Sequence, residues 1–328
     1  MTRAITIRGA GVAGLCVASE LMDRGVAVTL RDPAPAPGPH ACSWWAGGML
    51  APFCEGATAE EPVVRLGQEA ADWWEAQGVA VIRRGSLVVT LERDRRELEV
   101  FARRTTGHRV LTGDDLADLE PHIADRHDRA LHFESEAHID PRAALAHLRG
   151  RLEAQGARFE QGDAPPDGAT IDCRGLAARD SLPELRGVKG EMVVLRTRDV
   201  SLTRPVRLLH PRFPLYIVPR GDGVFMLGAT QIESEERGRA SARSVMELLS
   251  AAYALHPAFG EAEVVEIGAD ARPAFPDNLP RLTRRGDTLH VNGLFRHGFL
   301  LSPAVARMTA DVVTGRNEAP EVLHEDHR

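Results

Sequence analysis

The chain has little cysteine, few aromatic residues and no long apolar run. Its 328 residues include four cysteines, and none of them stands in a CxxC pair. A disulfide framework and a cysteine-ligated zinc site are therefore not expected. No uninterrupted apolar stretch approaches the roughly 20 residues that cross a bilayer, and the glycine-broken N-terminus lacks a signal-peptide cleavage pattern. These absences predict a protein without a membrane span, in the reducing cytoplasm.

An excess of positive charge is also missing. The formal net charge is −7, so general attraction to nucleic acid or to an anionic membrane is not expected. The 13 histidines form no HExxH motif or comparable cluster, and we expect no metal site. The length exceeds what one hydrophobic core usually holds, so two closely connected domains are the default.

The opening of the chain carries the most informative pattern, a strand, a glycine-rich turn, a helix, a second strand and an acid. Gly9 permits the tight turn, Gly11 lets the backbone approach a pyrophosphate, and Gly14 lets the helix lie close to the sheet. The helix N-terminus favours phosphate charge, and Asp32 can accept from a ribose hydroxyl. This order predicts dinucleotide binding. The alternative is a glycine-rich turn that binds nothing.

Later segments change from this pattern to a run of strands and then return to helix. The elements that periodicity and end signals predict are helices at 60–77, 94–105, 140–155, 240–255 and 302–314, with strands at 86–91, 129–133, 169–173, 188–195, 206–209, 215–218, 224–229, 264–272 and 288–292. We expect the last ten residues to form a polar tail.

This arrangement predicts an α/β (α+β) fold, in which a Rossmann-like domain is joined to a mainly antiparallel sheet. We expect residues 1–79, 138–186 and 268–328 to form the nucleotide-binding domain. Residues 80–137 and 187–267 are expected to form the substrate-binding domain.

Three side chains near the C-terminal part are candidates for substrate binding. Arg272 and Arg296 lie in apolar, turn-rich surroundings, where a guanidinium needs a partner such as a substrate carboxylate. The alternative is an internal salt bridge to Asp270 or Asp277. Tyr216 can donate to the same carboxylate or can simply pack on its strand. A helix that begins near Pro303 would direct its positive end toward the preceding glycine turn.

With these residues located, the chain resembles the FAD-dependent amine and D-amino acid oxidase family, and most of all its glycine oxidase branch of thiamine biosynthesis. The segments that carry the resemblance are GAGVAG with Asp32, SWWAGGMLAP, HIDPRAALAHL, LYIVPRGDGVFMLGAT, GADARPAFPDNLP and GLFRHGFLLSPAVA. They span nearly the whole chain in the family's order. The resemblance implies a flavin domain whose active site is roofed by an antiparallel sheet.

The resemblance also implies roles for individual residues. Tyr216 and Arg272 match the pair that holds the amino acid carboxylate, and Arg296 matches a residue near substrate and flavin. The positions that match FAD contacts are Gly9, Gly11, Val12, Ala13, Gly14, Asp32, Ser43, Ala46, Gly47, Gly48, Met49, Gly175, Arg296, His297, Gly298, Phe299, Leu300 and Leu301. One segment departs from the family: IDCRGLA places Cys173 and Arg174 where small residues are common, and the stretch between Gly156 and Ile171 is short. We expect both departures to affect FAD affinity before reaction type.

The implied activity is FAD-dependent oxidative deamination of glycine or a small amino acid. Hydride passes to flavin N5, O2 is reduced to H2O2, and the imine hydrolyses or is handed to the thiazole synthase step. Alternatives are an oxidase or dehydrogenase of sarcosine or another D-amino acid, an NAD-dependent dehydrogenase, and a non-catalytic flavin-binding subunit. A homo-oligomer is left open.

Overall fold

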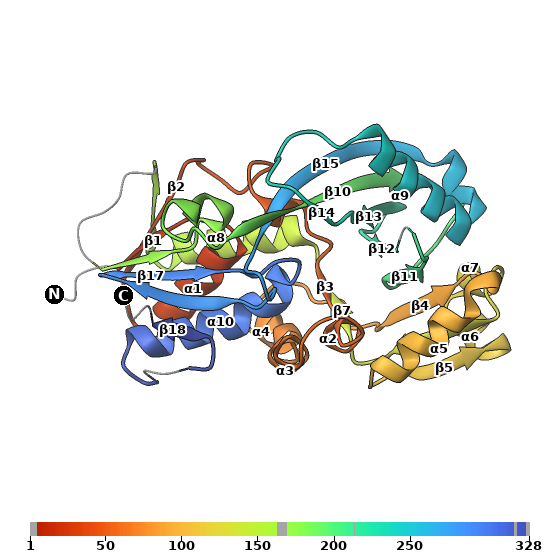
Figure 1. The fold of residues 1–328 in the computed structure, drawn as a ribbon, viewed down its shortest axis with the longest axis horizontal. Helices are drawn as coiled ribbons and strands as arrows, with labels where there is room; N and C mark the ends of the chain where they lie inside the picture. Colours follow the sequence, from red (N-terminus) through yellow and green to blue (C-terminus); the bar gives the residue numbers. More distant parts are fainter. Residues whose placement is uncertain (1–4, 163–168, 213, 318–319, 326–328) are drawn as a thin grey trace.

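Two large β-sheets organise the chain, and segments distant in sequence alternate between them (Figure 1). The computed structural model describes residues 5–162, 169–212, 214–317 and 320–325. Residues 163–168 lie outside these ranges; they belong to the stretch between Gly156 and Ile171 that we expected to be short. The last three residues of the predicted tail also lie outside them. No helix in the described ranges has the length and apolar character that a membrane crossing requires.

The first sheet has seven strands and is mainly parallel. Strand β1 pairs in parallel with β2 on one side and β9 on the other, so the C-terminal ends of these three strands meet at one edge, where α/β sheets commonly bind ligands. The strand order is β18 (Leu323–Glu325), β16 (Arg281–Arg285), β17 (Thr288–Asn292), β9 (Thr170–Asp172), β1 (Ile5–Arg8), β2 (Val28–Asp32) and β8 (Arg158–Gln161).

Three helices pack together beside this sheet. The helix α1 (Val12–Asp23) contacts both α8 (Pro141–Ala154) and α10 (Gly298–Val313). Asp140 caps α8 by accepting from the Arg142 and Ala143 amides at 2.8 and 3.2 Å. Their apolar faces form one hydrophobic core with the strands, and a second core lies beneath the other sheet. The predicted domain boundaries stay a prediction.

The second sheet has nine strands and is antiparallel except for the β4–β11 pair. Its long strands β10 (Arg186–Arg196) and β15 (Glu263–Ala274) curve across the molecule beside each other (Figure 1). The remaining strands are β14 (Ile232–Glu233), β13 (Val224–Gly228), β12 (Leu215–Pro219), β11 (Val206–Leu209), β4 (Ser86–Thr90), β6 (Arg129–Phe133) and β5 (Arg109–Thr112).

Short elements complete the fold. The short strands β3 (Met49–Leu50) and β7 (Ala137–His138) pair with each other in a separate two-stranded sheet. The other helices are α2 (Pro52–Glu55), α3 (Glu61–Gly67), α4 (Ala70–Ala76), α5 (Arg95–Arg104), α6 (Gly113–Leu119), α7 (Pro121–Ala124) and α9 (Ala242–Leu255), with 3-10 turns at Cys42–Trp45, Glu92–Asp94, Gly175–Asp180 and Pro257–Glu261.

The predicted fold class is confirmed, and the structure corrects three predicted elements. The helix predicted at 60–77 is two helices, and the first ends at Gly67, a residue type that is unfavourable inside a helix. Gly67 also lies close to α10, since a Cβ there would lie 2.8 Å from the Leu300 Cγ. The predicted tail is wrong for Leu323–Glu325, which pair with β16 as β18. The last helix begins one turn earlier than predicted, at Gly298, so Pro303 lies inside it.

Trp74 explains how α10 tolerates this internal proline. Pro303 has no N–H for the Phe299 carbonyl four residues earlier, and the Trp74 indole Nε1 donates to that carbonyl at 2.9 Å instead. The indole is fully buried and its ring also stacks on Phe299.

We expect Trp74→Phe to cost about 1 to 3 kcal/mol in the free energy of unfolding, because it leaves the Phe299 carbonyl without a donor. In a Pro303→Ala background the new amide can donate to that carbonyl. The cost of Trp74→Phe should then be smaller, which a double-mutant cycle by denaturant unfolding measures. An equal cost in both backgrounds would show that the indole does not replace the missing amide.

Candidate functional site

A cavity of about 600 Å³ lies where the two sheets meet. Its walls come from the turn after β1, the end of β2, residues 41–49, strands β12 and β15, and the start of α10. Most of the predicted site residues line it. The exceptions are Gly14 and Leu301, which lie behind its wall; Leu301 is fully buried in the core.

The glycine-rich turn is shaped for close backbone approach. Gly9 has φ +94°, and a Cβ on it would lie 2.6 Å from the Cys173 carbonyl oxygen. A Cβ on Gly14 would lie 1.9 Å from the Gly9 carbonyl oxygen, so α1 can pack here only with glycine. The Val12 amide at the start of α1 donates to Ser43 Oγ at 3.3 Å. A cradle of this kind, open at a helix N-terminus, fits the pyrophosphate of a dinucleotide.

Asp32 stands at the end of β2 beside this turn and lines the cavity. Its Oδ2 accepts from the Ala10 amide at 2.8 Å and its Oδ1 from the Ala34 amide at 3.0 Å. The carboxylate therefore holds the turns after β1 and β2 together. Its contact with a ribose stays a prediction.

The departure at IDCRGLA has a structural reason. The Arg174 Nη2 lies 2.7 Å from Asp172 Oδ2 and 2.8 Å from Asp180 Oδ1, so two carboxylates neutralise the guanidinium. The Cys173 carbonyl packs against Gly9, as described above. Arg174 thus adds no unpaired cation to the cavity wall, although the expected effect of this segment on FAD affinity stays a prediction.

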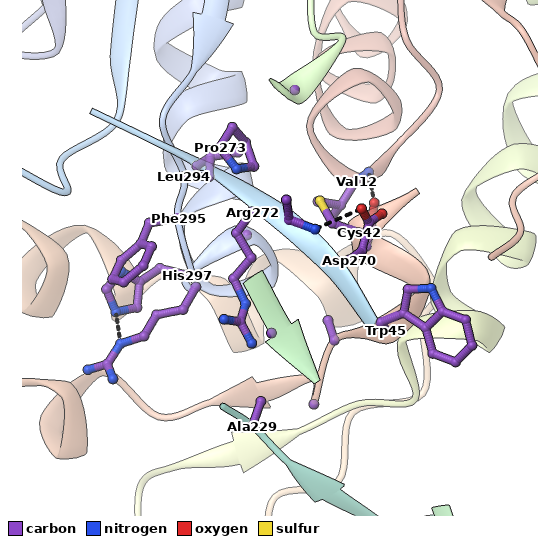
Figure 2. Close-up of a pocket in the computed structure, with 18 of the residues that line it drawn as sticks. Val12, Cys42, Trp45, Ala229, Asp270, Arg272, Pro273, Leu294, Phe295 and His297 are labelled. Carbon is purple, nitrogen blue, oxygen red and sulfur yellow. Dashed lines mark hydrogen bonds between the residues drawn. The ribbon is translucent and has the colours of Figure 1, made fainter. Parts of the chain in front are cut away.

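Arg272 extends from β15 into the cavity, between Cys42 and Asp270 on one side and Phe295 and His297 on the other (Figure 2). Among the described residues no carboxylate pairs with it, and its Nη1 donates to the Thr230 carbonyl at 3.2 Å. The alternative partners are occupied: Asp270 pairs with Arg237 at 2.6 Å and Asp277 with Arg281 at 2.8 Å.

The surroundings of Arg272 leave its cation uncompensated. Burial lowers the pKa of Arg272 from its usual value, because the opposing effects of Tyr216, Cys42 and Asp270 do not outweigh the loss of water. The guanidinium lies tightly against β10, where a Cβ on Gly190 would stand 2.0 Å from Nη2. The fold therefore positions a cation at the cavity and leaves it for an anion to satisfy.

Tyr216 lines the same cavity from β12, and two glycines make room for its ring. A Cβ on Gly47 would lie 2.7 Å from its Cε2, and one on Gly228 would lie 2.6 Å from its hydroxyl oxygen. Burial raises the pKa of Tyr216, so the phenol keeps its proton. Tyr216 is partly exposed, and its contact with a substrate carboxylate stays a prediction.

Arg296 also lines the cavity, but a protein carboxylate holds it. Its Nη2 lies 2.5 Å from Glu55 Oε2 and 2.8 Å from Thr58 Oγ1. The salt-bridge alternative therefore applies to Arg296, with Glu55 in place of Asp270 or Asp277. Its predicted contact with substrate and flavin stays a prediction.

The start of α10 meets the start of α1 at the cavity. A Cβ on Gly298 would lie 3.4 Å from the Val12 Cγ1, so the two helix N-termini are neighbours. The first amides of a helix have no intrahelical acceptor and carry partial positive charge. The positive end that we expected near Pro303 is instead at Gly298.

Two charged residues of the site, Glu55 and Arg207, were not predicted from the sequence. Glu55 ends the short helix α2 and is 8% exposed, and its Oε1 lies 2.8 Å from Arg207 Nη2 on β11. Burial alone would raise the pKa of Glu55, but Arg296, Arg207 and His297 outweigh it and hold this pKa well below its usual value. The sequence feature that could have indicated them is a single charged residue within an apolar segment, Glu55 in APFCEGA and Arg207 in VRLL.

A second buried carboxylate, Glu136, fixes the helix that carries Glu55. Its Oε1 accepts from the Cys54 amide at 2.7 Å, and Ser86 Oγ donates to its Oε2. Glu136 is 1% exposed, and burial raises its pKa to about 7, against the opposing effect of these donors. The acid is thus protonated in the folded state at a pH where the unfolded chain has lost the proton.

This difference predicts a pH dependence of stability. Since the folded pKa is the higher one, the stabilisation is complete below about 4.5 and is lost as the pH rises to about 7. Glu136→Gln removes the titration, so its free energy of unfolding relative to the parent should rise by roughly 2 to 3 kcal/mol between pH 5 and pH 8. Denaturant unfolding at both pH values measures this. A constant difference would contradict the raised pKa.

Known proteins resemble this chain over nearly its whole length. A Rhizobium etli protein named "Putative thiamine biosynthesis oxidoreductase ThiO" is 55% identical over 323 residues, covering 97% of this chain and 98% of its own. A Trichormus variabilis "Bifunctional protein ThiO/ThiG" is 25% identical, and its matched part is 54% of that protein and 99% of this chain. The crystal structure of glycine oxidase from Bacillus cereus superposes with a TM-score of 0.80 at 21% identity, covering 96% of this chain and 95% of that one.

The family comparison decides between the cofactors left open by the opening motif. Residues 4–312 match the family DAO, described as FAD dependent oxidoreductase. The cradle at Gly9 and Gly14 and the cavity beside it fit this cofactor, and the alternative of an NAD-dependent dehydrogenase is wrong. No group of three or more His, Cys, Asp or Glu residues that would hold a metal occurs among the described residues. The chain belongs to the DAO family of FAD-dependent oxidoreductases.

Proposed function

We propose that the protein oxidises glycine or another small amino acid whose carboxylate is held by Arg272 and Tyr216. The observation that carries the proposal is the Arg272 guanidinium, which lines the cavity without a carboxylate partner in the described chain. A guanidinium fork binds a carboxylate through two parallel hydrogen bonds. The protonated Tyr216 hydroxyl, on another strand of the same sheet and lining the same cavity, supplies a further donor.

The residues then have separate tasks. Arg272 and Tyr216 fix the acid group and so orient the α-carbon, which reduces the entropy cost of reaction. FAD, when bound, supplies the acceptor for the hydride that leaves the α-carbon. The amide groups at the start of α10 stabilise negative charge at that end of the cavity. Glu55 does not act as a base, because Arg296, Arg207 and His297 hold its pKa well below the usual value.

Relatives support a place for this reaction in thiamine biosynthesis. The Rhizobium etli relative carries that pathway in its name, and the Trichormus variabilis relative joins the counterpart of this chain to a second part, ThiG. We propose that the imine product is handed to the enzyme that forms the thiazole, and that O2 reoxidises the cofactor with formation of H2O2. The proposal does not require the two proteins to be fused.

A substrate panel tests this proposal. The purified holoenzyme is mixed in air with glycine, sarcosine and D-alanine, while oxygen uptake and peroxide are measured. We expect glycine to give the highest kcat/KM, with one peroxide formed for each substrate oxidised. Turnover of sarcosine or D-alanine alone would favour the alternative substrate classes. Turnover only with an artificial electron acceptor would favour a dehydrogenase.

A further inference from the structure

Glu55 occupies what is otherwise a complete anion-binding site in the cavity wall. Its carboxylate is contacted by Arg207 Nη2 at 2.8 Å, by Arg296 Nη2 at 2.5 Å and by His297 Nε2 at 3.0 Å. Two guanidiniums and an imidazole from two separate segments, β11 and the turn just before α10, converge on one acid group. This is the arrangement that a bound carboxylate requires, and here the chain supplies the carboxylate itself.

The occupied site lies next to the proposed substrate position. Arg207 stands directly opposite Tyr216 in the β11–β12 register, and Arg207, Arg272 and Arg296 all contribute to the electrostatic surroundings of the Tyr216 hydroxyl. All four side chains line the same cavity as Glu55. Of these three guanidiniums, Glu55 neutralises two, those of Arg207 and Arg296.

We propose that Glu55 is a specificity-determining residue that restricts the substrate to amines with a single acidic group. The inference rests on the proposed function, since Arg272 takes the one acid group that the substrate brings. The negative charge of Glu55 would repel a second carboxylate on the substrate. Arg207 and Arg296 could not bind that carboxylate, because both already pair with Glu55. Because Glu55 is part of the chain, it loses little entropy when it pairs with the two arginines. A free anion loses more, so it competes poorly with Glu55.

D-Alanine and D-aspartate form a matched pair of test substrates, since they differ by one carboxylate. The wild-type holoenzyme should prefer D-alanine in kcat/KM. In Glu55→Gln the two guanidiniums are released, and the D-aspartate to D-alanine ratio should rise about tenfold or more, because a charge-assisted contact is gained and a repulsion is lost. An unchanged or lower ratio in this variant would overturn the proposal, as would equal use of both substrates by the wild type.

Glu247→Gln is the control for loss of one negative charge at the same cavity. Glu247 lines the cavity from α9, but its Oε1 lies 3.8 Å from Arg243 and contacts neither Arg207 nor Arg296. This variant should leave the substrate ratio at the wild-type value. A rise as large as that in Glu55→Gln would mean that net charge, and not the occupied site, sets the specificity.

Anion binding separates this inference from the proposed function. Dissociation constants for acetate and malonate, measured from the change in the flavin spectrum, need no turnover. The malonate to acetate preference should rise about tenfold in Glu55→Gln even if none of the tested amines is oxidised, and no rise would overturn the inference. If loss of the carboxylate prevents folding, Glu55→Gln/Arg207→Gln keeps the charge balance and leaves Arg296 free. A smaller rise is then expected, and none would again overturn it.

Discussion

Replacing Arg272 with methionine is expected to raise the KM for glycine roughly 10- to 150-fold without lowering the melting temperature. The kinetic effect follows from the loss of a charge-assisted, two-point contact worth about 1.5 to 3 kcal/mol. The stability effect has the opposite origin: the guanidinium is enclosed without a carboxylate partner in the described chain, so the native fold gains nothing from its charge. Steady-state kinetics and thermal unfolding of the same preparations measure both.

Two controls separate anchoring from a general effect of lost charge. Arg272→Lys keeps the cation but loses the planar fork, and its KM should lie between those of the parent and of the methionine variant. Arg281→Met removes a guanidinium that pairs with Asp277 at 2.8 Å outside the cavity. That variant should keep the KM of the parent. If Arg272→Met turned over glycine with the parental KM, Arg272 would not be the anchor.

Gly14→Ala is expected to abolish FAD binding and to lower the melting temperature strongly. The new Cβ would stand 1.9 Å from the Gly9 carbonyl oxygen, so α1 and the turn must separate. The overlap involves backbone atoms, which cannot move aside as a side chain does. The amount of flavin retained per protein after gel filtration, and thermal unfolding, measure the two effects.

Gly150→Ala is the matched control for this substitution. Gly150 lies in α8, and a Cβ there would meet no atom within 4 Å. Alanine inside a helix is more favourable than glycine by about 0.5 to 1 kcal/mol, so this variant should be slightly more stable and should keep its flavin. Full retention of flavin by Gly14→Ala would show that the cradle tolerates a side chain at that position.

Local signals were sufficient to predict much of the fold. The opening unit, the capped helix after Asp140 and strands such as Val206–Leu209 are set by neighbouring residues, because glycine, proline and apolar spacing act over a few positions. The helix ends were less predictable, since contacts with distant residues accompany them. Gly67 lies against Leu300, and the Phe299 carbonyl in α10 accepts from an indole 225 residues away along the chain.

The same distinction holds for the site. Arg272 and Tyr216 were recognised by their local setting and by the family resemblance, and both line the cavity. The carboxylate that holds Arg296 was not found, because Glu55 lies 241 positions away along the chain. Pairing between elements so far apart depends on how α2, β11 and the start of α10 pack, which sequence spacing does not encode.

Anaerobic mixing of the holoenzyme with glycine tests the central claim most directly. The absorption band of the oxidised flavin should disappear at a rate that saturates with glycine concentration. For Arg272→Met the glycine concentration needed for half the maximal rate should be at least about tenfold higher. Persistence of the oxidised band in the wild type with glycine, sarcosine and D-alanine alike would contradict the account.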